Sequence, residues 1–125
     1  MLPPIPYALL KDTAVFHVTT GIDSWKHRLV VDHKVTNVHI QPSNETRKTA
    51  ENTEVVLSAI LFVDCKRSKP FVNLLSLQEK SQNNGEGMTV TIYSRGNARD
   101  YTVRTVEDIP DIPSGKTHHF ELGLV

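Results

Sequence analysis

Histidine is the residue type that most readily suggests chemistry here, because the chain holds six and neutral imidazole is a common metal ligand. His33 and His39 lie on the same side of an extended strand when residues are counted in twos. They would then be about 20 Å apart, too far to share one ion. His118 and His119 are adjacent, and strand alternation points them to opposite faces. Sequence spacing therefore predicts no local metal site.

Distant segments leave two further kinds of chemistry to weigh. A metal site formed in the folded chain by His17, His119 and a carboxylate such as Glu121 is one interpretation. The alternative is that these histidines lie at the surface or at an interface. Nucleophilic catalysis would need Cys65 or a serine next to a histidine and an oxyanion hole. The sequence has neither a nucleophile elbow nor a Cys-His signature. Cys65 is expected to be a small buried apolar side chain, and neither a metal nor a cofactor is predicted.

Glycines and carboxylates give no stronger signal. Gly85 and Gly87 form only Gly-x-Gly, without a third glycine or a following helix, so they are expected in a turn and not around a phosphate. Glu107, Asp108 and Asp111 lie in a proline-rich stretch without a rigid scaffold for acid–base work, and solvated loop charges are expected. The sequence therefore predicts no catalytic residues and no enzyme.

Basic side chains gather in two polar stretches, and both stretches are predicted to be exposed loops. They are Arg47 and Lys48 in residues 42–52, and Lys66, Arg67 and Lys69 in residues 64–70. These loops are candidates to face DNA passing through a channel, although without interleaved aromatics they also resemble ordinary solvated loops. The formal net charge is zero, with 14 basic and 14 acidic residues. No excess charge is therefore available to attract nucleic acid or anionic lipid.

Length and composition favour one small β domain spanning residues 1–125. The single cysteine excludes an intrachain disulfide, and the first residues lack the charge and long apolar run of a signal peptide. No apolar run is long enough for a membrane span, so a protein that is soluble when made is expected. Short bursts of Val, Ile and Thr between turn-forming stretches predict an all-β fold.

The expected architecture is a single small β-barrel or sandwich of five to six mostly antiparallel strands with long loops. Strands are predicted at residues 13–20, 25–40, 54–64, 88–93, 101–106 and 119–124. The stretch 54–64 is apolar on both faces, so it should be central or covered by a second sheet or another subunit. Residues 71–80 fit a short helix or an irregular packed segment, and residues 95–99 fit a hairpin turn.

Residues 1–12 are predicted to form an extended N-terminal arm. Three prolines within the first six residues remove backbone donors and fix φ, which disfavours both helix and strand. An arm of this kind can lie on a neighbouring subunit. The residues expected to make that contact are Pro3, Pro4, Ile5, Pro6 and Tyr7.

Four segments carry a resemblance to a known family. They are LPPIPYALLKDTAVFHV near the start, NVHIQPS at 37–43, AILFVDCKRSKPF at 59–71 and IPSGKTHHFELGLV at the end. These segments resemble the minor capsid proteins encoded between the head and tail genes of tailed phages of Gram-positive bacteria. The resemblance spans nearly the whole chain. Residues 72–100 depart from the family pattern and retain only its hairpin. The family's loop details therefore cannot be transferred to this region.

The resemblance implies a head-completion or stopper protein, a small β-barrel subunit in the neck of a long-tailed phage. Its ring, twelvefold in relatives, would close the portal channel, retain packaged DNA and dock the tail. The implied partners are other copies of the chain, a portal-adaptor protein on the head side, and a tail terminator or tail tube on the tail side. The resemblance also allows non-specific contact with packaged DNA, and it implies no membrane partner. The resemblance also implies that the protein is made in the host cytoplasm and located in the virion.

Two alternatives remain open at this point. A tail terminator or another tail-joining protein would form a ring of a different symmetry on the far side of the joint. A small ligand- or carbohydrate-binding β domain belongs to another class, and its exposed platform would be formed by Trp25, Tyr93 and Tyr101. An enzyme would need a buried acid or histidine in a pocket, which the pattern does not predict.

Overall fold

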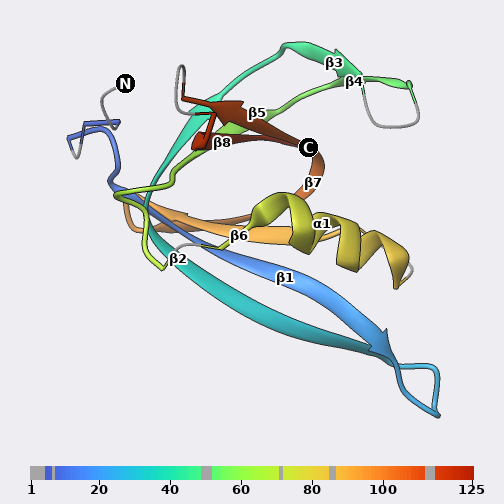
Figure 1. Cartoon of the computed structure of the whole chain (residues 1–125). Helices are drawn as coiled ribbons and strands as arrows, with labels where there is room; N and C mark the ends of the chain where they lie inside the picture. The colour runs from blue at the N-terminus through green and yellow to red at the C-terminus, as the bar shows by residue number, and fades with distance from the viewer. Residues whose placement is uncertain (1–4, 7, 49–51, 71, 85–86, 112–114) are drawn as a thin grey trace.

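The structure is a computed structural model that describes residues 5–6, 8–48, 52–70, 72–84, 87–111 and 115–125. One helix and eight strands follow one another within these ranges (Figure 1). They are β1 (Asp12–Ile22), β2 (Arg28–Pro42), β3 (Thr46–Lys48), β4 (Glu54–Val56), β5 (Ala59–Asp64), α1 (Leu74–Asn83), β6 (Thr89–Ser94), β7 (Asn97–Pro110) and β8 (Thr117–Leu124).

Six strands close into a ring and form a small barrel. Their order is β1-β2-β5-β8-β7-β6, and β6 pairs back with β1. Every neighbouring pair in the ring is antiparallel. Strands β3 and β4 form a separate two-stranded sheet. The predicted all-β class, with six antiparallel strands, is confirmed.

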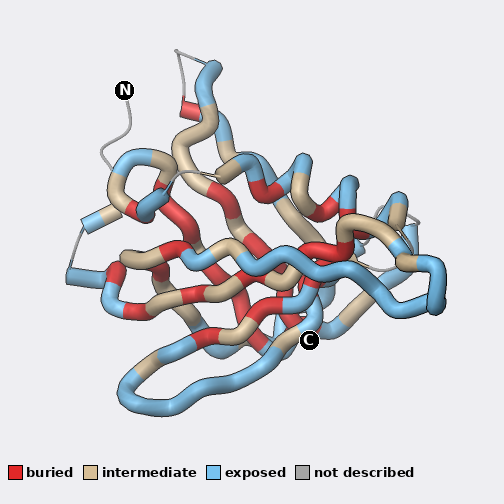
Figure 2. Tube along the Cα trace, turned by 90° about the horizontal axis from the view of Figure 1, so that it is seen from below, coloured by how far each residue is buried: buried red, intermediate tan, exposed pale blue. Residues whose placement is uncertain are grey.

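The core fills the barrel, because one face of each strand is apolar. In β1 the side chains of Ala14, Phe16 and Val18 are fully buried, and the residues between them are less so. On the opposite wall, Phe120 and Leu122 of β8 are buried in the same alternating way. Figure 2 shows buried residues gathered in the middle of the molecule and exposed residues along the projecting turns. Period-two alternation therefore directs one face of each strand inward.

Helix α1 covers the end of the barrel at which β1 ends and β6 begins. Its Gln78 side chain donates from Nε2 to the Val103 carbonyl and accepts from the Met88 amide at Oε1, with distances of 3.0 and 2.8 Å. Ser81 Oγ accepts from the Thr19 amide at 3.1 Å. The Asn73 side chain caps the helix by accepting from the Ser76 amide. The helical alternative for this region is confirmed.

The predicted strand 54–64 is wrong in its continuity, because it is broken at residues 57–58. The Leu57 amide donates to the Glu45 carbonyl and the Ser58 amide donates to the Leu124 carbonyl. The backbone thus leaves one partner for another at this point. The following strand β5 is buried on nearly all positions and lies between β2 and β8. Its expected central place is confirmed.

Two other boundaries also differ from prediction. The strand expected from Trp25 begins at Arg28, because the Asp23 carboxylate accepts from the amides of Trp25 and His27 and closes a turn. The expected loop 42–52 contains β3, which pairs with β4, although most described side chains there are exposed.

A bulge in β2 overturns the expected relation between His33 and His39. Asp12 pairs with Val38 while Thr13 pairs with Thr36, so Asn37 is an extra residue, and its φ is 58°. An extra residue reverses the alternation that follows it. The two histidines therefore lie on opposite faces of the strand and not on the same side.

Candidate functional site

The β1–β2 ladder continues well beyond the barrel wall. β1 pairs with β6 only from Thr13 to His17, and β2 pairs with β5 only from Val38 to Pro42. The two strands nevertheless stay paired with each other out to Ile22. Their distal parts therefore form a two-stranded hairpin, which we call the projecting hairpin and define as residues 20–31. It extends away from the body of the molecule in Figure 1.

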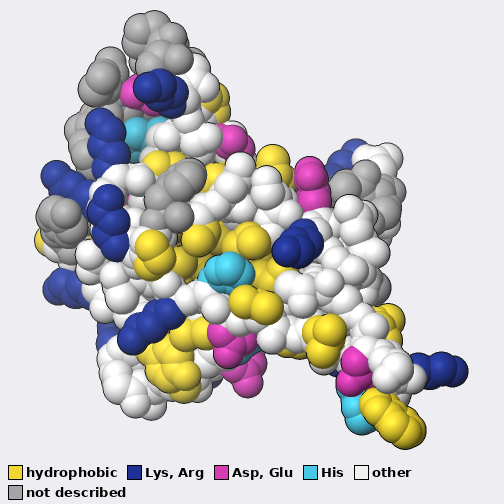
Figure 3. Space-filling view, turned by 60° about the horizontal axis from the view of Figure 1, so that its bottom comes forward, with side chains coloured by type: hydrophobic (Ala, Val, Ile, Leu, Met, Phe, Trp, Pro, Cys, Tyr) yellow, Lys and Arg dark blue, Asp and Glu magenta, His cyan; other side chains and the backbone are white. Residues whose placement is uncertain are grey.

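The projecting hairpin carries large apolar side chains that its own chain leaves exposed. They are Ile22, Trp25, Leu29, Val30 and Val31. Trp25 is 81% exposed at the turn, and Val30 and Val31 are 50% and 46% exposed although they are consecutive. Consecutive strand residues point to opposite faces, so both faces of the hairpin present apolar surface. Figure 3 shows its end standing clear of the rest of the surface.

The loop 64–70 is tied to the barrel by backbone hydrogen bonds. The buried Asp64 carboxylate accepts from the amides of Lys66 and Arg67 at Oδ1. Lys69 exchanges two backbone hydrogen bonds with Thr36 in β2. The side chains of Lys66 and Lys69 remain exposed, whereas Arg67 is partly buried. Part of this predicted loop is thus a fixed turn that presents two lysines.

The described part of the N-terminal arm is held by that same turn. The Ile5 amide donates to Asp64 Oδ2 at 2.7 Å, and Arg67 Nη1 donates to the Ile5 carbonyl at 3.2 Å. Pro6 is exposed, and the Leu9 amide donates to its carbonyl. Ile5 is therefore anchored to its own subunit, while Pro3, Pro4 and Tyr7 lie outside the described residues.

Arg47 is not a freely exposed cation. Its Nη2 donates to Glu45 at 3.1 Å, and its Nη1 lies 3.0 Å from Glu107 in an ion pair. Glu121 lies 3.5 Å from Nη2. Burial alone would lower the pKa of Arg47, but the hydrogen bond to Glu45 and the surrounding carboxylates outweigh it and raise the pKa. This charge is engaged within the chain, whereas the neighbouring Lys48 is exposed.

The five basic residues are not brought together in one place. Arg47 and Lys48 lie on β3, which precedes the barrel strand β5. The other three follow the far end of β5 in the turn at 64–70. These two segments lie well apart in Figure 1. A single continuous basic surface therefore does not form from them.

An aromatic row crosses the outer face of β2, β5 and β8. Phe62 stacks against His39 on one side and His119 on the other, with ring centroids 5.8 and 6.3 Å apart. The rings of His118 and His119 meet edge to face, with their Nδ1 atoms 2.7 Å apart. The prediction that these two rings point to opposite faces is wrong, because the rings are in direct contact.

The three-residue metal site that the sequence left open does not assemble. His119 Nε2 lies 3.0 Å from Glu121, but His17 lies on β1, which is not a neighbour of β8 in the barrel. Across the described ranges, no group of three His, Cys, Asp or Glu side chains is arranged to hold a metal ion. The His119–Glu121 pair instead extends the polar network around Arg47.

His17 joins four strands through a chain of hydrogen bonds. Its Nδ1 lies 2.6 Å from Asp32 on β2, and its Nε2 lies 2.9 Å from Thr91 Oγ1 on β6. The Thr91 hydroxyl in turn donates to Asp100 on β7 at 2.6 Å. This is the order of an acid–base–nucleophile triad, but the hydroxyl proton is directed to Asp100 and not to the imidazole. The arrangement links neighbouring strands by hydrogen bonds and does not activate the Thr91 hydroxyl as a nucleophile.

Cys65 packs half-buried against the core. Burial, reinforced by the nearby charges of Asp64 and Asp108, raises the pKa of the Cys65 thiol to about 11. The thiolate is the reactive form, so at neutral pH this side chain is a poor nucleophile.

The predicted loop carboxylates lie elsewhere. Glu107 and Asp108 are part of β7, which continues to Pro110 opposite Thr117. Asp111 is buried. The expected loop is wrong for Glu107 and Asp108, because β7 is longer than its sequence pattern indicates, but both side chains are exposed as expected. Of the two turn glycines, Gly87 precedes β6, and Gly85 lies outside the described residues.

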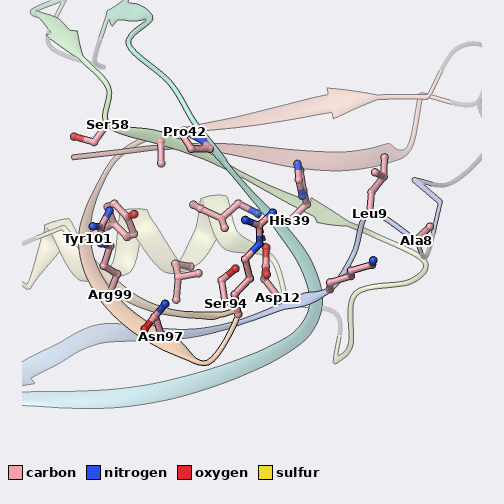
Figure 4. Close-up of a pocket in the computed structure, with 15 residues that line it drawn as sticks. Ala8, Leu9, Asp12, His39, Pro42, Ser58, Ser94, Asn97, Arg99 and Tyr101 are labelled. Atoms are coloured by element: carbon pink, nitrogen blue, oxygen red, sulfur yellow. Dashed lines mark hydrogen bonds between the residues drawn. The ribbon is translucent and has the colours of Figure 1, made fainter.

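A cavity of about 740 Å³ opens at the end of the barrel opposite α1. It is bordered by the start of β1, the end of β2, the start of β5 and the β6–β7 turn. Figure 4 shows Tyr101 and Arg99 on one side of this mouth and Asp12 and His39 on the other. Tyr101 belongs to the mouth, whereas Trp25 lies on the projecting hairpin. The aromatic platform expected of Trp25, Tyr93 and Tyr101 is therefore not assembled.

Comparison with protein-family models, with curated proteins and with solved structures finds no match for this chain. Within the part of the chain that the structure describes, no helix is long and apolar enough to cross a membrane.

Proposed function

We propose that the protein is a structural subunit of a phage head-to-tail connector, which assembles with copies of itself into a ring in the neck of the virion. The ring closes the portal channel, retains packaged DNA, meets the portal adaptor on the head side and docks the tail. Support comes from the four sequence segments that resemble minor capsid proteins and from the small barrel with its projecting hairpin. The proposed role is non-catalytic.

The projecting hairpin is the observation that carries this proposal. A two-stranded ribbon without further packing is marginally stable in water, and this one exposes Leu29, Val30 and Val31 along its length. Contiguous exposed apolar surface marks sites where other protein covers the molecule. In a closed ring of identical subunits, one surface of each subunit meets a different surface on the next subunit. A hairpin that extends past its own barrel supplies such a surface.

The basic residues divide within this proposal. Lys48, Lys66 and Lys69 are exposed and are the proposed contacts with packaged DNA. Arg47 and Arg67 are held by Glu45 and by the Ile5 carbonyl, so they act mainly within the subunit. The arm from Pro3 to Tyr7 remains the proposed contact with a neighbour, reached from the anchor at Ile5.

Assembly is tested by native mass spectrometry and electron microscopy of the purified protein. We expect a closed ring, twelvefold if the protein is a stopper. A double variant, Leu29→Ser with Val31→Ser, should raise the dissociation constant of the ring at least about tenfold, because two apolar contacts are lost. Val56→Ser serves as the control, because Val56 is even more exposed, at 63%, but lies on β4. It should leave the ring intact.

The same images distinguish the alternatives. A ring of another symmetry that caps isolated tails would favour a tail terminator. A monomer at all concentrations that is absent from virions would contradict the connector proposal altogether.

A further inference from the structure

We infer that the open mouth of the barrel binds a small amphiphilic anion, a carboxylate with a short apolar tail. This inference concerns a different surface from the projecting hairpin and goes beyond the connector function. It depends on the shape of the mouth, on its unengaged cations and on its apolar wall.

The mouth has the shape of a ligand site because, among the described residues, a helix covers only one end of the barrel. α1 covers the end where β1 ends and β6 begins, through Gln78 and Ser81. The opposite end leaves a cavity of about 740 Å³. That volume lies within the range of small-molecule pockets, which occur preferentially at barrel mouths. A β-barrel of this size elsewhere fills its interior with side chains, so the cavity is confined to this end.

Three cationic side chains border the mouth, and one carboxylate accompanies them. They are Lys11, Arg95 and Arg99, against Asp12. Among the described residues, no hydrogen bond or ion pair engages either guanidinium or the lysine amine. The Asp12 carboxylate accepts from the Ile40 amide at Oδ2, at 3.0 Å, and its single negative charge offsets only one of the three cations. The mouth therefore offers unpaired positive charge in a chain whose formal net charge is zero.

The β6–β7 hairpin brings Arg95 and Arg99 to the opening. Arg95 and Gly96 form the two-residue β6–β7 turn, both with positive φ, 53° and 79°. Arg99 pairs across the ladder with Ile92, whose side chain is buried in the barrel. Directly paired residues share a face of the sheet, so Arg99 lies on the inner face where the barrel opens. Guanidinium groups in this position suit a planar carboxylate.

The deeper wall of the mouth is apolar. It includes Ile40, Ala59 and Ile92, and Tyr101 adds an aromatic ring with a hydroxyl. A hydrophilic anion such as inorganic phosphate would leave this wall in contact with water. A carboxylate with an alkyl tail places its charge at the arginines and its tail on the wall, which fits both features at once.

Octanoate is the probe for this inference, and octanol is its uncharged counterpart. Titration of the full-length protein, followed by calorimetry and by NMR, should show saturable octanoate binding with shifts at the mouth. Octanol and inorganic phosphate should each bind at least about tenfold more weakly, because each lacks one half of the match. Arg99→Gln and Arg95→Gln should each weaken octanoate binding about tenfold.

Arg104→Gln is the matched control, because Arg104 lies on the same strand β7 and does not border the mouth. It should leave binding unchanged. Equal binding of octanol and octanoate, equal loss in the Arg104 variant, or no saturable binding of octanoate would each overturn the inference. The oligomeric state, measured on the same samples, reports separately on the connector proposal.

Discussion

The two halves of the β1–β2 ladder are built from the same alternating apolar residues but have opposite surroundings. Val18 and Val31 are directly paired, yet Val18 is fully buried and Val31 is 46% exposed. Nearer the barrel, Phe16 and Val35 are fully buried in the core cluster that also contains Leu74 of α1. The distal half has no such cover within the described chain. The hairpin therefore has the composition of a core strand but no core of its own to pack against.

The first prediction contrasts core and hairpin side chains directly. Phe16→Ala should lower the free energy of unfolding by about 3–5 kcal/mol, because it opens a cavity in the fully packed interior. The paired substitutions Val18→Ala and Val31→Ala should differ as their burial does, with losses of about 2 kcal/mol and under about 0.5 kcal/mol. Urea denaturation of the dissociated protein measures all three. Equal losses for the two valines would refute the contrast.

Two aspartates that organise turns provide the next comparison. Asp64→Ala should cost about 2–4 kcal/mol of unfolding free energy, because three backbone amides, those of Ile5, Lys66 and Arg67, lose a buried acceptor. Asp23→Ala removes the acceptor for two amides in the exposed hairpin turn and should cost about 1 kcal/mol or less. Thermal denaturation compares the two variants. A larger loss of stability in Asp23→Ala than in Asp64→Ala would contradict the stronger role of the buried carboxylate.

Two glycines sharpen the same comparison on the scale of one methyl group. A Cβ at Gly123 would clash with Thr105 Oγ1 and lie 2.9 Å from Leu57 methyl carbons. Gly123→Ala should therefore destabilise by about 1–3 kcal/mol. A Cβ at Gly21, in the hairpin, would approach only Leu29 at 3.9 Å. Gly21→Ala should change stability by under about 0.5 kcal/mol. Unfolding by guanidinium chloride distinguishes the two, and similar values would contradict the tight packing behind β8.

The last prediction concerns the Cys65 thiol, whose effect on stability arises only at alkaline pH. The thiol pKa rises from 9.0 to about 11 on folding, so its contribution to stability is complete below about pH 9 and is lost as the pH rises through 11. At pH 8 a disulfide reagent should label the folded protein about a hundredfold more slowly than the urea-unfolded protein. Equal labelling rates would show that the thiol is not shielded by the barrel.

Sequence alone was sufficient for most of the barrel strands. Alternation in residues 88–93 and 119–124 predicted β6 and β8, because one side of each strand faces the core. It was insufficient at Leu57 and Asn37. The break at Leu57 depends on a hydrogen bond to Glu45, and the bulge at Asn37 depends on pairing with β1. Such choices are made by partners distant in sequence, which local patterns do not encode.

The candidate surfaces were less accessible from sequence than the fold. Leu29 to Val31 have the same residue types as a buried strand, and only the shorter pairing of β6 and β5 leaves them exposed. The sequence around Arg99 and Tyr101 has the same alternation as an ordinary surface strand. Their place at the mouth follows from barrel closure. A signal that was present is the asparagine at 73, a favoured helix N-cap before residues that fit a helix.

The fluorescence of Trp25, the only tryptophan, tests most directly whether another copy of the chain covers the projecting hairpin. In the assembled ring we expect its emission to lie to the blue of an exposed indole. Dilution below the dissociation constant of the ring, or the Leu29→Ser and Val31→Ser double variant, should shift it to the red. A ring whose Trp25 emission stays that of a water-exposed indole at every concentration would show that other surfaces hold the subunits together.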